Sequence, residues 1–155
     1  MIKQLMSIYE INGVKNKIRY LVIFATVLFS YNGFSQSLLI FGGRNHDVYL
    51  GCLNCSKYET SSIWNQYGAH GSKYNSQCIW NQYGQYGGKY SNTSPFNPHA
   101  SNPPVLVDED GNFYGYFTAN KYHTKRTNNK LALFIIEYWE MIANDVGKAY
   151  ETIFN

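Results

Sequence analysis

The chain has 155 residues, which is enough for one modest domain, and it carries 13 basic against 10 acidic side chains. Four of the basic side chains and one acidic side chain precede residue 36, so the remainder has nine of each and no net charge. Without a basic excess, residues 36–155 offer little attraction to the phosphates of a nucleic acid or to an anionic membrane surface. We therefore expect no nucleic-acid partner.

Residues 1–35 have the composition of a secretory signal peptide. A basic stretch from Lys15 to Arg19 precedes the apolar run 21–29, and small residues follow it. A membrane-spanning helix would need ~20 apolar residues, about twice the length of this run. The sequence therefore predicts a secreted, periplasmic or cell-envelope protein, with no stable membrane span after cleavage. Residues 36–155 then form a single repeat-containing domain.

Residues 37–53 and 104–119 each have the pattern of a β-hairpin. In both, two apolar runs flank a polar, glycine-containing turn, and the second turn contains the Asp110-Gly111 step that favours a tight hairpin. The segments 49–58 and 113–122 also align with each other without gaps. Because an isolated hairpin is marginally stable in water, we expect the two similar hairpins to pair into one small antiparallel sheet.

A 16-residue motif occurs three times between these hairpins, over residues 55–102. Its copies read CSKYETSSIWNQYGAH, GSKYNSQCIWNQYGQY and GGKYSNTSPFNPHASN. A fixed period predicts one small structural unit that stacks on copies of itself. Within a copy we expect a short helix with Ser62 as its N-cap, Gly68 at its end, and Ile63, Trp64 and Tyr67 on one face.

The segment 130–147 predicts a C-terminal amphipathic helix. Its apolar residues follow the 3–4 spacing of one buried face from Leu131 to Val146, and Gly147 is the expected stop. The predicted fold class is therefore α+β: a small antiparallel sheet from two similar hairpins, three short helical repeats inserted between them, and this helix.

The string Ser-Ile-Trp-Asn-Gln-Tyr-Gly, followed by Gly-Ser-Lys-Tyr, resembles a pattern in a loose group of uncharacterised exported bacterial proteins. Those proteins carry tandem copies of Ser-Ile-(Phe/Trp)-Asn-x-Tyr-Gly…Gly-Ser-x-Tyr, often bracketed by similar glycine-containing hairpins. The resemblance covers about residues 47–122. It implies an exported or envelope location, and it implies no activity and no catalytic residue.

The three cysteines are Cys52, Cys55 and Cys78. In an exported protein a structural disulfide is the leading interpretation, either Cys52–Cys55 or Cys55–Cys78, with one thiol left over. A C-x-x-C sequence is also found in redox pairs and zinc sites, but this one leaves a predicted strand and lacks a second ligand pair. Cys78 occupies the slot of Ser62 and Ser94, which indicates a small residue at the start of a short helix.

The repeat places aromatic residues in two regular series. These are the candidate binding residues: Tyr58, Tyr74 and Tyr90 in one series, and Trp64, Trp80 and Phe96 in the other. One series should form core, and an exposed series would be a platform for sugar rings or a protein partner. The accessibility of the tyrosines distinguishes these cases.

Two classes of function follow. The first is a non-catalytic envelope or extracellular binding module, with an envelope glycan or protein as partner. The alternative is a small secreted enzyme or thiol-active protein that uses Cys52 and Cys55. We favour the first, and we assign no catalytic, cofactor-binding or metal-ligating residue, because no nucleophile, phosphate-loop or metal-ligand motif is present. The acidic turn 108–112 also fails the calcium-loop pattern.

Overall fold

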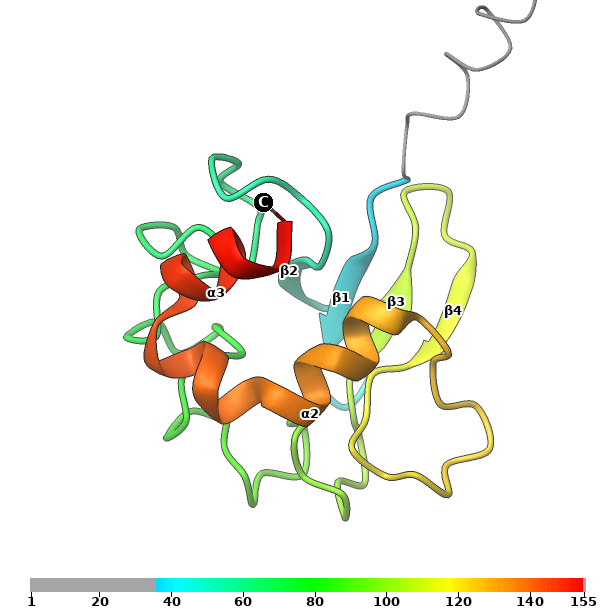
Figure 1. The fold of residues 1–155 in the computed structure, drawn as a ribbon. Coiled ribbons are helices and arrows are strands. Elements are labelled where there is room, and N and C mark those ends of the chain that lie inside the picture. The colour runs from blue at the N-terminus through cyan, green and yellow to red at the C-terminus, as the bar shows by residue number, and fades with distance from the viewer. Residues whose placement is uncertain (1–35, 155) are drawn as a thin grey trace, which may run out of the picture. The chain divides into compact units, whose positions relative to one another are not determined.

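The computed structural model describes residues 36–154, and the signal-peptide prediction lies outside these residues. Four strands form one antiparallel sheet in the order β2-β1-β3-β4 (Figure 1). The elements are β1 (Leu39–Gly42), β2 (Val48–Cys52), β3 (Val105–Val107), β4 (Phe113–Tyr116), α2 (Lys130–Asn144) and α3 (Val146–Phe154). The α+β class with a small antiparallel sheet and a C-terminal helix is thus confirmed.

The two outer strands, β2 and β4, meet the rest of the chain in the same way. Cys52 forms a parallel bridge with Ser62, and Tyr116 forms one with Arg126, at the same spacing of ten residues. The residue before each bridge is a glycine with positive φ, 120° for Gly51 and 103° for Gly115. Added Cβ atoms would lie within 2.8 Å of Ile63 Cγ2 and 2.7 Å of Thr127 Cα respectively, so only glycine fits.

The repeats are turns, and the expected short helices are absent from residues 55–102. In Figure 1 they project as a series of loops alongside α2 and α3. In the first copy, four backbone amides spaced three residues apart each donate to the carbonyl three residues earlier. The donors are Glu59, Ser62, Asn65 and Gly68. This correction matters for function, because a turn directs its side chains differently from a helix.

Side chains of the repeat itself prevent the helix. Ser62 Oγ accepts from the Trp64 amide at 3.1 Å, and Asn65 Oδ1 accepts from the Tyr67 amide at 3.2 Å. Asn65 Nδ2 also donates to the Glu59 carbonyl at 3.2 Å. These bonds occupy groups that a helix would have paired along its own backbone, which is how serine and asparagine compete with helix formation. The same two asparagine bonds recur at Asn81 and Asn97.

The core of the repeats is a buried aromatic ladder. Trp64, Trp80 and Phe96 are at most 3% exposed, and their ring centroids are 5.6 and 6.3 Å apart. Each such contact contributes about 0.5–1.5 kcal/mol beyond the area that it buries. The C-terminal helices pack on this ladder: Trp139 of α2 stacks on Phe96 at 4.6 Å, and Tyr150 of α3 lies 5.9 Å from Trp64.

The predicted single helix over 130–147 is two helices. Asn129 caps α2 by accepting from the Ala132 amide at 3.0 Å, as an N-cap residue should. The helix ends at Asp145, whose φ and ψ are −147° and 84°. Asp145 Oδ1 then accepts from the Lys148 amide at 3.0 Å and so begins α3, which contains Gly147 in its first turn. The expected stop at Gly147 is therefore wrong, because the carboxylate cap restarts the helix one residue earlier. Neither described helix is long and apolar enough to cross a bilayer.

Candidate binding groove

The two aromatic series of the repeat differ sharply in exposure. Tyr58, Tyr74 and Tyr90 are 82%, 86% and 88% exposed, each at the same position of its copy, whereas the Trp/Phe series is buried. Side chains this exposed bury little area within the protein, and a contiguous series of them is typical of an interaction surface. Of the six candidate aromatics, the three tyrosines are therefore the ones that a partner could contact.

A second row of exposed tyrosines lies beside the first. Tyr67 and Tyr83 are 91% and 100% exposed, and His99 occupies their slot in the third copy. This row was not predicted from the sequence, because the expected short helix would have placed Tyr67 on the buried face with Trp64. The signal that could have found it is the Asn-x-Tyr spacing, since an Asn that bonds the amide two residues on indicates a turn.

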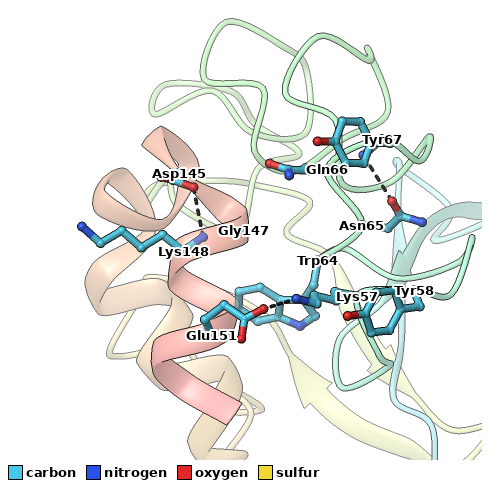
Figure 2. Close-up of a pocket in the computed structure, with 10 residues that line it drawn as sticks. All are labelled: Lys57, Tyr58, Trp64, Asn65, Gln66, Tyr67, Asp145, Gly147, Lys148 and Glu151. Carbon is cyan, nitrogen blue, oxygen red and sulfur yellow. Dashed lines mark hydrogen bonds and ion pairs between the residues drawn. The ribbon is translucent and has the colours of Figure 1, made fainter. Parts of the chain in front are cut away.

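The first copy and α3 enclose a hollow of about 480 Å³. Its repeat side is lined by Lys57, Tyr58, Asn65, Gln66 and Tyr67, and its helix side by Asp145, Lys148 and Glu151. Figure 2 shows Lys57 and Glu151 joined by an ion pair beside Trp64, with Tyr58 beyond Lys57 and Tyr67 farther off, beside Gln66. We call this hollow the first subsite.

The second copy encloses an equivalent hollow of about 400 Å³, here called the second subsite. The same repeat positions line it, shifted by 16 residues: Lys73, Tyr74, Asn81, Gln82 and Tyr83. Ala143 and Asn144 close it on the helix side. A further hollow of about 450 Å³ runs from Tyr67 to Lys73 and Tyr74, so the two subsites are parts of one groove.

The third copy departs from this arrangement. Pro98 and His99 replace the Gln and Tyr of the other copies, and Lys89 forms an ion pair with Glu140 at 3.4 Å. The groove therefore has two equivalent subsites, with Tyr90 continuing the outer tyrosine row beyond them.

The lysines of the two subsites are in different electrostatic environments. Lys57 forms an ion pair with Glu151, and this hydrogen bond raises the pKa of Lys57. Lys73 is exposed, its ammonium lies 5.7 Å from the Tyr74 ring centroid, and no described carboxylate is within ion-pair distance of it. The second subsite thus presents an uncompensated positive charge beside an aromatic face.

The cysteines do not form a thiol site. Cys52 and Cys55 are joined by a disulfide, which selects the first of the two expected pairings. Cys78 is the free thiol, and burial raises its pKa to about 12. A thiol with this pKa is not ionised at neutral pH, so it is a poor nucleophile.

In the acidic turn after β3, the Asp108 carboxylate is hydrogen-bonded by groups of the same hairpin. Asp108 accepts hydrogen bonds from the amides of Asp110 and Asn112 and from the side chains of Asn112 and Tyr114. Within residues 36–154, no group of three or more His, Cys, Asp or Glu side chains is arranged to hold a metal ion. The candidate binding surface is the groove, because it combines two similar hollows with exposed tyrosines.

No protein-family model, no curated protein and no solved structure matches the chain. The function is accordingly inferred from the geometry of the groove.

Proposed function

We propose that the protein is an exported, non-catalytic binding module that holds an envelope glycan along its tyrosine rows. The observation that carries this proposal is the exposure of Tyr58, Tyr74 and Tyr90, each above 80%, at the same position of three successive copies. The secreted or envelope location rests on the leader composition and on the repeat resemblance, and the disulfide is compatible with it.

The chemistry of the groove suits a sugar polymer. The apolar face of a sugar ring packs on an exposed aromatic ring, and nearby amides such as Gln66 and Gln82 supply hydrogen bonds to hydroxyls. Two equivalent subsites repeated along one groove fit a ligand that repeats along its own length. Simultaneous contact at both subsites raises affinity beyond that of either one.

The carboxylates of the groove support a binding role over hydrolysis. Glycoside hydrolysis uses a pair of carboxyl groups, one on each side of the scissile bond. In the first subsite Glu151 is paired with Lys57, and Asp145 caps α3. The second subsite has no carboxylate among its lining residues. The alternative function, a thiol-active enzyme, ranks second because no feature of Cys52, Cys55 or Cys78 favours it.

The test is binding of the purified protein to isolated envelope glycans, including peptidoglycan, measured by sedimentation and by calorimetry. A variant that combines Tyr58→Ala, Tyr74→Ala and Tyr90→Ala should bind at least about tenfold more weakly, since each lost stack removes part of the binding free energy. Tyr122→Ala is the matched control, because Tyr122 also follows a lysine and is 94% exposed but lies outside the groove. Equal binding by the triple variant and the wild-type protein would contradict the proposal.

A further inference from the structure

We infer that the second subsite binds a carboxylate-bearing sugar, with Lys73 as its counter-ion, while the first subsite binds a neutral sugar of the same chain. This inference rests on the proposed function and adds the charge and the register of the ligand. It follows from a comparison of two sites that share their repeat residues and differ on the helix side.

The repeat supplies the same lysine three times, and the helices neutralise two of the three. Lys57 pairs with Glu151 of α3, and Lys89 pairs with Glu140 of α2. The part of the helices that faces the second subsite presents Ala143 and Asn144 instead, and neither carries a charge. Among these three lysines, within the described residues, Lys73 is the one whose charge remains available to a ligand.

The surroundings of Lys73 also favour a sugar that carries a carboxylate over a small free anion. Its ammonium lies beside the Tyr74 ring, and Tyr83 also lines the subsite. A sugar ring packed on Tyr74 would bring a carboxylate substituent to the lysine. Gln82 lines the same subsite and can bond the hydroxyls.

Asp145 is the one carboxylate that lines the connecting hollow with Lys73. Within the described residues it forms no ion pair with Lys73, and its Oδ1 is held at the start of α3 by the Lys148 amide. Lys148 also lines the first subsite, but Figure 2 shows its side chain directed away from Lys57 and Glu151. The lysine that the repeat contributes to the first subsite is already paired with Glu151, which suits a neutral sugar there.

The experiment is calorimetric titration of the purified protein with a linear uronic-acid oligosaccharide and with the same oligosaccharide after reduction of its carboxyl groups to alcohols. Peptidoglycan fragments, with and without blocked carboxyl groups, form a second pair of probes. Lys73→Gln is the test variant. Lys121→Gln is the matched control, since Lys121 also precedes an exposed tyrosine and its loss changes net charge equally.

We expect the wild-type protein to prefer the acidic member of a pair, and Lys73→Gln to lower that affinity about tenfold, the effect of losing one charge-assisted hydrogen bond. Lys73→Gln should leave the affinity for the neutral member within about twofold, and Lys121→Gln should change neither. Raised salt should weaken binding of the acidic member alone.

Equal affinity for acidic and neutral members, or equal effects of the two lysine variants, would overturn this inference while leaving glycan binding intact. If the protein bound none of the four probes, neither the two oligosaccharides nor the two peptidoglycan preparations, the result would contradict the proposed function together with this inference. A circular dichroism spectrum of Lys73→Gln that matches the wild-type spectrum excludes misfolding as the cause of any loss.

Discussion

The indole nitrogen of Trp80 donates a hydrogen bond to the carbonyl of Ile63, one copy earlier in the repeat, at 2.5 Å. The indole nitrogen of Trp64 donates to the carbonyl of Leu53, which precedes the first copy, at 2.7 Å. The aromatic ladder is thus anchored by polar bonds to the end of β2 and between the first two copies, as well as by stacking. The indole bonds fix the first copy to the end of β2 and the second copy to the first, and the third copy follows through stacking of Phe96 on Trp80, which supports the register of the tyrosine rows.

Trp80→Phe should lower the free energy of unfolding by about 1–3 kcal/mol, because it keeps a ring but leaves the buried Ile63 carbonyl without this donor. Phe96 shows that the ladder accepts a phenyl ring at this slot. Trp139→Phe is the control, because Trp139 is only partly buried and stacks through its ring face. Urea denaturation checks the prediction, and an equal loss in both variants would refute a special role for the indole bond.

Cys78→Ser should change the free energy of unfolding by less than about 1 kcal/mol. Serine already occupies this slot in the other copies, and Ser62 Oγ makes the same two bonds that Cys78 Sγ makes, to a carbonyl seven or eight residues earlier and to the amide two residues later. Cys78→Ala removes both bonds and should cost more. A serine variant less stable than the alanine variant would contradict the equivalence of the copies.

Gly51→Ala should destabilise the protein by more than Gly111→Ala. Both residues have positive φ, 120° and 83°, so alanine is strained at either position. A Cβ at Gly51 would also lie 2.8 Å from atoms of Ile63 and His70, whereas nothing lies within 4 Å at Gly111. We expect a loss of about 1 kcal/mol at Gly111 from strain, and at least about 3 kcal/mol at Gly51, measured by thermal unfolding.

His70 should make stability depend on pH. Burial lowers its pKa below the usual 6.5, although a hydrogen bond to the backbone of Leu50 opposes the shift, and its buried Nδ1 has no hydrogen-bond partner among the described residues. The folded protein then binds a proton less readily than the unfolded chain. Stability is therefore full above pH 6.5 and falls as the pH drops below that value towards the lowered pKa.

His70→Gln tests this pH dependence. The free energy of unfolding should lose slope between about pH 7 and pH 5 in the variant, because glutamine does not titrate. The remaining histidines are unchanged in both proteins, so the difference isolates His70. Identical slopes in the two proteins would show that His70 titrates alike in the folded and unfolded states.

The sequence predicted the architecture best where local chemistry and tertiary packing agree. The apolar runs on either side of polar turns, with the Asp110-Gly111 step, indicated strands that the sheet contains. The 16-residue period indicated a repeated unit. The short helices were wrong because Ser62 and Asn65 bond to nearby amides, and a hydrophobic spacing alone does not reveal that competition. The helix stop at Gly147 was wrong for a similar reason, since the Asp145 cap outweighs the glycine.

Only part of the candidate site could be predicted from the sequence. The period identified Tyr58, Tyr74 and Tyr90, but the exposure of a ring depends on which side of a turn faces α2 and α3. The exposure of the second tyrosine row and the lack of an ion-pair partner for Lys73 depend on where the helices cross the repeats. At the second subsite, for example, the helix presents Ala143 and no carboxylate. Such contacts between distant segments leave no local signature.

Residue-resolved protection of the tyrosines tests glycan binding along the groove most directly. The protein is nitrated with and without saturating envelope glycan, and each tyrosine is quantified by mass spectrometry. Tyr58, Tyr74 and Tyr90 should be protected by the glycan, while Tyr122, which is equally exposed, should react as before. Protection of Tyr122 alone, or unchanged reactivity of the three groove tyrosines with glycan bound, would contradict the assignment of the groove as the binding surface.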